Sequence, residues 1–421
     1  MKRSIVSALT LVLGLLLALP LAAQNLPSAK PEEVGLSSER LARLVARIKA
    51  DSEKGVIPGA VVIVARHGKV ALYEAIGFLD PQTKTPMPKD AIFRIYSMSK
   101  PIASVAAMQL VEEGKLGLDQ PVGAYIPSFA KQKIAPLKAE DGKPVEFTPA
   151  RRPMTVQDLL RHSSGITYGF FGEGVAKKAY VDANLFANDN TNAEFAELIA
   201  VLPLAFEPGT TWDYSHSTDI LGRVIEVATG KSLLAAEKER VLDPLGMKDT
   251  NFYVTDKTKH GRIAEPFAND RAIGGGIMFF DPRLVGKWES AGGGMMGTAM
   301  DYARFLQMLL NGGELEGKRI ISKATVAFMT ADHMGSIVKP GPYYLPGAGY
   351  GFGLGFAVRL DNGVSPIPGT AGDYYWGGAG GTYFWVDPKQ DMFVILMLQS
   401  PKMRVPYRTL IRDMVYGAVI K

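Results

Sequence analysis

The chain has 421 residues, of which 47% are hydrophobic and 21% are charged, a globular composition with enough apolar side chain for a large core. Its formal net charge of +5 comes from mixed signs without a long basic run, which argues against a nucleic-acid partner. The chain has no cysteine, which excludes disulfides, thiol catalysis and cysteine-based metal sites.

The first 23 residues have the pattern of a secretory signal peptide. A short basic start is followed by an apolar run to about Leu19 and by the small pair Ala22–Ala23, after which we predict cleavage before Gln24. We therefore expect a periplasmic or secreted protein with no stable membrane insertion after cleavage. Leu21 is not an ideal residue at the third position before the cut, so a retained N-terminal anchor is the alternative.

The segments that follow alternate between helix and strand patterns. Residues 38–50 carry apolar side chains at helical spacing, and Gly59–Phe78 predicts two strands around a turn at His67–Gly68. The nearly all-apolar run after Pro101 predicts a long buried helix. From about residue 118 to residue 291 we expect helices and long loops.

Strand patterns return between Tyr350 and Ser400, and Tyr407–Ile420 predicts a final helix. Before them, Thr298 and Asp301 predict a helix that starts with a capping box. Strands at both chain ends favour an α/β fold, in which one antiparallel sheet is flanked by terminal helices and carries an inserted, mostly helical lobe. We predict one catalytic domain over residues 24–421, with the sheet lobe at about 30–92 and 300–421 and the helical lobe at about 93–299.

Ser97 and Lys100 lie three residues apart at the start of the long apolar helix. On a helix this spacing places both side chains on one face, about one turn from each other. Burying an ammonium group is costly and favours the neutral amine, which can take the proton of a neighbouring hydroxyl. The N–H groups of a helix N-terminus can also help to hold an oxyanion. The pattern therefore predicts a nucleophilic serine with a lysine base.

The same S-x-x-K pattern occurs at Ser128–Lys131 and Ser336–Lys339, and roughly one or two matches are expected by chance in this composition. Neither of these opens a long apolar helix. A solvated helix start with Ser97 or Ser99 as its cap stays open as the alternative interpretation.

Two later segments add weight to Ser97. Tyr214 and Ser215 lie in a loop just before a helix, where the alternative role of the tyrosine is a half-buried anchor whose hydroxyl caps a backbone group. The pair Gly377–Gly378 interrupts a strand pattern, which indicates either a bulge or the close approach of a ligand or another backbone.

Together and in this order, the three segments resemble the serine β-lactamase and penicillin-binding-protein superfamily, and most closely its class C-like branch of esterases and β-lactamase-related serine hydrolases. The family motifs S-x-x-K, Y-x-N or Y-S-x, and K-T-G or a variant such as W-G-G correspond to Ser97–Lys100, Tyr214–His216 and Trp376–Gly378. Segments such as Leu159–Gly169 and Ala291–Gly313 extend the likeness over about residues 30–420.

The resemblance implies an α/β sandwich with a cleft between the sheet and the helical lobe. It implies that Ser97 is the acylated nucleophile and that Lys100 and Tyr214 share proton transfer. It further implies an oxyanion hole made by the backbone N–H groups of Ser97 and Ala379. The substrate-binding residues that it implies are His216, Trp376, Gly377 and Gly378.

Three departures from the family pattern bear on the substrate. Trp376 replaces the lysine that meets the substrate carboxylate in true class C β-lactamases, Gly377 replaces the threonine, and His216 replaces the asparagine of the second motif. Losing a cation and a hydroxyl weakens binding of an anionic β-lactam, whereas an indole favours a neutral acyl or alcohol group. We therefore predict an exported serine hydrolase of carboxylic esters or amides. The alternatives are a β-lactamase, a D-alanyl-D-alanine carboxypeptidase, an acyltransferase, or a catalytically silent homologue that binds cell-wall peptides.

The remaining polar candidates are interpreted as structural. No serine lies in a G-x-S-x-G pattern, so His162 is predicted to support a turn and not a hydrolase triad. No two histidines have the H-x-x-x-H spacing, and we expect neither a metal nor a cofactor. Asp219 is predicted to cap a helix or bridge the lobes, and Arg94 and Tyr96 to serve lobe packing.

Overall fold

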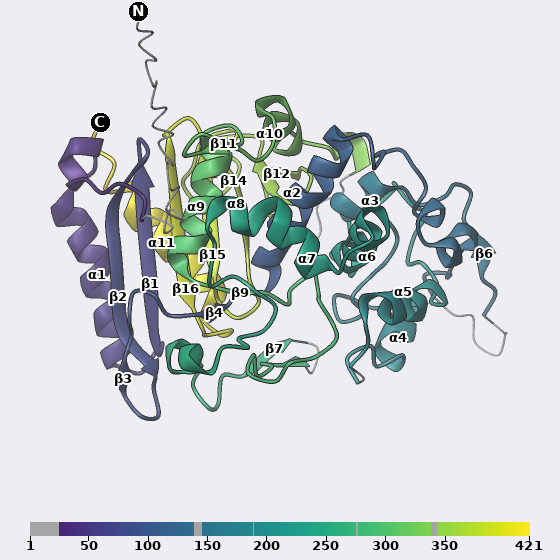
Figure 1. Ribbon diagram of the computed structural model, residues 1–421, viewed down its shortest axis with the longest axis horizontal. Coiled ribbons are helices and arrows are strands. Elements are labelled where there is room, and N and C mark those ends of the chain that lie inside the picture. The colour runs from purple at the N-terminus through teal and green to yellow at the C-terminus, as the bar shows by residue number, and fades with distance from the viewer. Residues whose placement is uncertain (1–24, 139–144, 188, 275–276, 338–342) are drawn as a thin grey trace, which may run out of the picture.

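The computed structural model describes residues 25–138, 145–187, 189–274, 277–337 and 343–421 (Figure 1). The predicted signal peptide and its cleavage site lie outside these residues, as does Lys339 of the third S-x-x-K match. None of the helices in the described ranges is long and apolar enough to cross a membrane.

A single sheet of eight antiparallel strands forms the core, in the order β12-β13-β14-β15-β16-β1-β2-β3. The two ends of the chain meet in this sheet, because β1 pairs with β16 from Ala60 opposite Leu398 to Arg66 opposite Met392. Both strands are buried along their whole length. This confirms the predicted fold class. The strands of the sheet are β1 (Gly59–Arg66), β2 (Lys69–Asp80), β3 (Thr85–Pro86), β12 (Tyr350–Phe352), β13 (Ala357–Arg359), β14 (Tyr374–Gly377), β15 (Tyr383–Asp387) and β16 (Met392–Leu398).

Helices cover both faces of this sheet. Figure 1 shows α1 on one side and α9 on the other, and α1 also packs against α11. The longer helices are α1 (Ser38–Glu53), α2 (Ser99–Glu112), α4 (Val175–Asp182), α5 (Asn192–Ala200), α6 (Ser217–Thr229), α9 (Ala299–Leu310), α10 (Lys323–Met329) and α11 (Arg404–Tyr416). The short ones are α3 (Val156–Leu160), α7 (Leu233–Glu237), the π-helical turn Lys238–Leu242 and α8 (Asp243–Leu245).

Short strand pairs complete the secondary structure. They are β4 (Phe93–Arg94) with β9 (Met296–Gly297), β5 (Lys133–Ile134) with β6 (Thr148–Pro149), β7 (Ala272–Gly274) with β8 (Ile277–Met278), and β10 (Glu314–Leu315) with β11 (Lys318–Arg319). In the chain, β4 lies shortly before α2 and β9 lies directly before α9. Their pairing therefore holds the starts of these two helices together.

The helices α3 to α6 gather beside the sheet, and α2 packs against α6 (Figure 1). The first ten residues of α2, Ser99 to Met108, are all buried, so the long buried helix predicted here is confirmed. It begins at Ser99, and the residues before it form a single 3₁₀ turn, Tyr96–Met98. The division into lobes at about residues 93 and 299 stays a prediction.

The start of α9 shows how a local pattern is altered by tertiary contacts. Thr298 caps the helix as predicted, with its Oγ1 accepting a hydrogen bond from the N–H of Asp301. The Asp301 carboxylate does not return to the cap residue but accepts hydrogen bonds from the N–H of Asp249 and from Thr250 Oγ1. Only half of the predicted capping box is formed, because a neighbouring loop provides better donors for a buried carboxylate.

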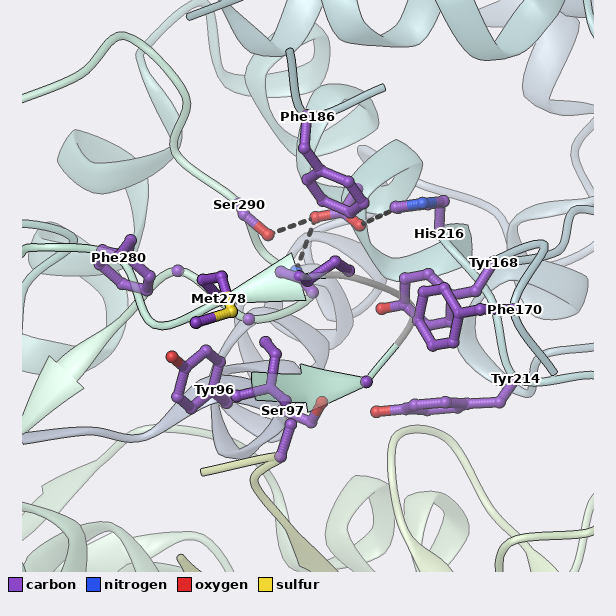
Figure 2. A pocket seen from close by; sticks show the side chains of 18 of the residues that line it. Tyr96, Ser97, Tyr168, Phe170, Phe186, Tyr214, His216, Met278, Phe280 and Ser290 are labelled. Carbon is purple, nitrogen blue, oxygen red and sulfur yellow. Dashed lines mark hydrogen bonds and ion pairs between the residues drawn. The ribbon is translucent and has the colours of Figure 1, made fainter. Parts of the chain in front are cut away.

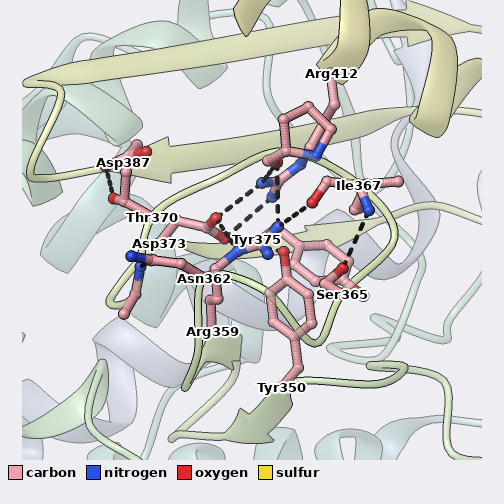
Figure 3. A network of polar contacts seen from close by, with 12 residues as sticks. Tyr350, Arg359, Asn362, Ser365, Ile367, Thr370, Asp373, Tyr375, Asp387 and Arg412 are labelled. Carbon is pink, nitrogen blue, oxygen red and sulfur yellow. Dashed lines mark hydrogen bonds and ion pairs between the residues drawn. The ribbon is translucent and has the colours of Figure 1, made fainter.

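A buried ion cluster attaches α11 to the sheet (Figure 3). Asp373, just before β14, accepts from Arg359 Nε at 2.7 Å and from Arg412 Nη1 at 2.9 Å. All three side chains are fully buried. Because Arg412 belongs to α11 and Arg359 to β13, one carboxylate fixes the helix to two neighbouring strands of the sheet.

We predict that Asp373→Asn destabilises the protein by about 3–5 kcal/mol, because it leaves two buried guanidinium groups without their anion. Urea unfolding followed by circular dichroism measures this change. Asp182→Asn is the matched control, since it breaks the solvent-exposed pair Lys178–Asp182 and should cost less than about 1 kcal/mol. Equal effects of the two substitutions would contradict the structural role of Asp373.

Candidate active site

The turn that carries Ser97 is held in a strained conformation. Tyr96 has a φ of +46°, in the left-handed region, which costs about 1–3 kcal/mol for a residue other than glycine. Ser99 Oγ donates to the Tyr96 carbonyl at 2.6 Å and accepts from the N–H of Met295 at 3.1 Å. Ser99 therefore fixes the turn that presents Ser97, and the two hydroxyls have different tasks.

Lys100 is buried in the first turn of α2, with 1% of its surface exposed. Its Nζ donates to Ser97 Oγ at 3.2 Å, to Tyr168 OH at 3.2 Å and to the Gly292 carbonyl at 2.5 Å. All three of these partners are uncharged groups. These contacts exclude the alternative of a solvated lysine at a surface helix start.

Two tyrosines face this lysine in different ways. Tyr168 contacts Nζ through its hydroxyl, whereas Tyr214 presents its ring, whose centroid lies 4.5 Å from Nζ. The Tyr214 hydroxyl instead accepts a hydrogen bond from Trp376 Nε1 at 3.0 Å. Burial, and then the neighbouring Tyr214 and Asp219, raise the pKa of Tyr168 well above its usual value, so this phenol keeps its proton.

Asp219 lines the same cavity and connects several of its wall residues, among them His216 and Ser290, which Figure 2 labels. Its carboxylate accepts from Ser290 Oγ at 2.6 Å and from the N–H of Gly292 at 3.0 Å, and it contacts His216 Nδ1 at 3.0 Å. Burial acts to raise its pKa, but the hydrogen bonds from His216 and Ser290 and the charge of Lys100 outweigh it and lower the pKa. Asp219 thus joins α6 to the loop whose Gly292 carbonyl holds Lys100.

The glycine-rich segment after β14 packs directly on the serine turn. A Cβ at Gly378 would overlap the Ile95 carbonyl, and Thr382 Oγ1 donates to that carbonyl at 3.1 Å. At Gly380 a Cβ would lie 2.8 Å from the Tyr96 ring. Close backbone approach, and not a bulge alone, explains why glycines stand here, and Ala379 between them lines the same cavity as Ser97.

A cavity of about 780 Å³ opens above Ser97 (Figure 2). Aromatic side chains form a large part of its wall, among them Phe170, Phe186, Phe280 and Trp288. Of the residues predicted for the site, Ser97, Tyr214, His216, Trp376, Gly377 and Ala379 line this cavity. Lys100 lies beneath Ser97, and Gly378 supports the wall from behind.

His162 lies outside this group. It is buried behind Tyr214, with its Nδ1 3.2 Å from Ser215 Oγ and its ring 4.8 Å from the Tyr214 ring. Burial, and then the charge of Lys100, hold its pKa well below the usual value, so the ring is neutral and supports the loop that carries Tyr214.

No sequence pattern marks Tyr168 or Gly292 as part of the site. Tyr168 lies in Leu159–Gly169, a segment that resembles the family without matching one of its catalytic motifs, and Gly292 lies in a run of glycines. Both contact Lys100 across large separations in the chain. Only the packing of α2 against these loops places them there.

A serine beside a buried lysine, at the start of a core helix and at the floor of a cavity, defines a serine hydrolase. A protein-family model described as Beta-lactamase matches residues 44–414, so the chain belongs to this family, in its class C-like part.

Known relatives and solved structures agree with this assignment. Esterase EstB of Burkholderia gladioli is 32% identical over 400 residues, which cover 89% of this chain and 96% of EstB. Lovastatin esterase of Penicillium rubens is 31% identical over 380 residues, which cover 84% of this chain and 91% of that enzyme. The solved structure of EstCE1, described as a hydrolase with promiscuous acyltransferase activity, superposes with a TM-score of 0.73 at 29% identity, covering 90% of this chain and 99% of EstCE1.

The contact between Gly378 and Ile95 leads to a testable prediction. Gly378→Ala should push the Ile95 carbonyl, two residues before Ser97, and cost about 1–3 kcal/mol of stability through overpacking, with a fall in hydrolytic activity. Thermal unfolding and ester hydrolysis measure the two effects. Gly261→Ala, where an added Cβ meets nothing within 4 Å, should change neither. Full activity of Gly378→Ala would refute the close packing of this segment.

Proposed function

We propose that the protein hydrolyses carboxylic esters through an acyl-enzyme formed on Ser97. The observation that carries the proposal is the hydrogen bond of 3.2 Å between Lys100 Nζ and Ser97 Oγ, at the floor of a mostly apolar cavity. The esterase names of EstB and lovastatin esterase support an ester as the substrate. The signal-peptide pattern of residues 1–23 supports export, which is part of the proposal.

In the acylation step, Ser97 Oγ forms a bond to the ester carbonyl carbon while its proton passes to Lys100, whose amine acts as the base in its unprotonated form. The N–H groups of Ser97 and Ala379 stabilise the oxyanion. When the tetrahedral intermediate collapses, the bond to the alcohol oxygen breaks and that oxygen takes the proton. Water then attacks the carbonyl carbon of the acyl-enzyme and gives one proton to Lys100. As the bond between Ser97 Oγ and the acyl carbon breaks, Lys100 passes this proton to Ser97 Oγ, and the carboxylic acid leaves.

The two tyrosines divide the remaining work in this proposal. Tyr168 contacts Lys100 through a hydroxyl that stays protonated, which suits a group that passes a proton between the lysine and the leaving alcohol. Tyr214 covers Lys100 with its ring, and its hydroxyl is oriented by Trp376. We assign proton transfer to both, with the Tyr168 hydroxyl as the direct hydrogen-bond partner of the amine.

Ser97→Ala should abolish labelling by a fluorophosphonate probe and lower ester hydrolysis by about 10³-fold or more, because the nucleophile is lost. Intact-mass spectrometry after a brief reaction with an ester should find one acyl adduct, on Ser97. Ser128→Ala is the matched control from a second S-x-x-K sequence, where Ser128 Oγ donates to Glu197. Labelling that persists in Ser97→Ala, or an unlabelled wild type, would overturn the proposal.

Tyr168→Phe should lower kcat by about 10²-fold with little change in KM, because it removes a proton-transferring hydroxyl and keeps the ring. Steady-state kinetics on a p-nitrophenyl ester measures both constants. Tyr180→Phe is a suitable control, since the Tyr180 hydroxyl is buried in α4 and does not line the cavity. An unchanged kcat for Tyr168→Phe beside a large loss for Tyr214→Phe would assign proton transfer to Tyr214 alone.

A further inference from the structure

Three arginines follow one another at four-residue spacing on α11: Arg404, Arg408 and Arg412. This spacing puts them on one face of the helix, which is turned to the sheet. Arg412 is neutralised by Asp373, with which it makes two hydrogen bonds. The other two arginines lie on the wall of the cavity above Ser97.

No carboxylate of the described residues pairs with Arg404 or Arg408. The hydrogen bond of Arg404 goes to the Ile273 carbonyl at 3.5 Å, a long distance for such a bond. Arg408 stacks over the Tyr383 ring at 5.4 Å, and its Nε is buried without a hydrogen-bond partner. Burial, and then the charge of Arg408, lower the pKa of Arg404.

The acidic residues that line the same cavity are already engaged. Asp219 is bonded to Ser290 and His216, Asp281 pairs with Arg283 at 2.9 Å, and Asp189 accepts from the N–H of Lys287 at 2.6 Å. Two like charges therefore stand about one helical turn apart on the wall of the cavity, and no carboxylate of the described residues pairs with either of them. Such an arrangement is costly unless a bound anion offsets it.

Gly377 makes room for one of these charges. A Cβ at this position would lie 2.5 Å from Arg408 Nη2 and 2.9 Å from the Thr382 carbonyl. The guanidinium can therefore reach the end of β14 only because residue 377 has no side chain. The W-G-G segment lacks the lysine and threonine of the family pattern. Arg404 and Arg408 of α11 place two cations on the wall of the same cavity.

We propose that Arg404 and Arg408 bind a carboxylate group carried by the ester substrate. Preferred substrates would then be half-esters of dicarboxylic acids, or esters whose alcohol part carries the carboxylate. This inference rests on the proposed ester hydrolysis, and it replaces the expectation of a neutral substrate that Trp376 and Gly377 suggested. Guanidinium groups suit this task because they bind carboxylates with paired, charge-assisted hydrogen bonds.

The test compares esters that differ only in one carboxylate. p-Nitrophenyl hemiglutarate against p-nitrophenyl valerate examines the acyl part, and 4-acetoxybenzoate against phenyl acetate examines the alcohol part. In the wild type, kcat/KM should favour the anionic member of one pair. Arg404→Gln and Arg408→Gln should each lower that anionic-to-neutral ratio about tenfold or more, mainly through KM.

Lys402→Gln is the matched control. It removes one positive charge two residues before Arg404, but its Nζ is exposed, bonds to the Asn269 carbonyl and does not line the cavity. If Arg404 and Arg408 form a specific carboxylate site, the anionic-to-neutral ratio of kcat/KM should not change in Lys402→Gln. If the preference came from general attraction by positive charge, this variant would lower the ratio as well. Arg408→Lys keeps the charge and should retain part of the preference, and thermal unfolding of each variant checks that the fold is kept.

A binding measurement separates this inference from the proposed reaction. Calorimetry with Ser97→Ala and the half-ester should detect binding that is about tenfold weaker or more when Arg404→Gln or Arg408→Gln is added. Equal binding with and without the arginines, or equal ratios for all variants, overturns the carboxylate site. A wild type that binds the half-ester but neither cleaves any ester nor forms an adduct on Ser97 overturns the proposed function and leaves the site standing.

Discussion

The burial of Lys100 is the constraint on which the active site depends. An amine in the interior must find hydrogen-bond partners, and here they come from Ser97, Tyr168 and the Gly292 carbonyl. These groups belong to segments far apart in the chain, so the lysine can be accommodated only after α2, the loop before α4 and the loop before α9 have assembled. Asp219 extends the network by fixing Gly292, which gives the lysine a nearby negative charge without a direct ion pair.

The cavity combines an aromatic wall with unevenly distributed charge. At its floor Lys100 is saturated with protein partners, which suits a group that exchanges one proton with Ser97. On the α11 side, Arg404 has one long hydrogen bond, to the Ile273 carbonyl, and Arg408 Nε is buried with no partner among the described residues. Both guanidinium groups can therefore bind a ligand. The same helix shows the contrast directly, because Arg412 is neutralised by Asp373 and holds α11 in place. On one face of α11, Arg412 therefore stabilises the fold, and Arg404 and Arg408 bind the carboxylate of the substrate in our proposal.

Local patterns predicted much of the fold correctly. The β1–β2 hairpin follows from two apolar runs around His67–Gly68, where both residues have a positive φ. Predictions were less accurate where tertiary contacts compete with local ones. The predicted strand region after Tyr350 begins with two short strands, β12 and β13, because the chain turns between them at Gly355, whose φ is +98°. Likewise Asp301 leaves its predicted capping box for donors in a neighbouring loop.

The sequence by itself indicated the pairing of Ser97 with Lys100, because a spacing of three residues at the start of a helix places two side chains on one face. It also indicated Tyr214 and the W-G-G segment, through motifs whose order identified the family. Only the tertiary structure decided that the Tyr168 hydroxyl, and not that of Tyr214, contacts the lysine. It also decided which arginine of α11 is neutralised, because Asp373 contacts Arg412 and neither of the other two arginines of this helical face. Helical spacing predicts that the three arginines share a face, but it predicts neither the strand order nor the position of a partner carboxylate.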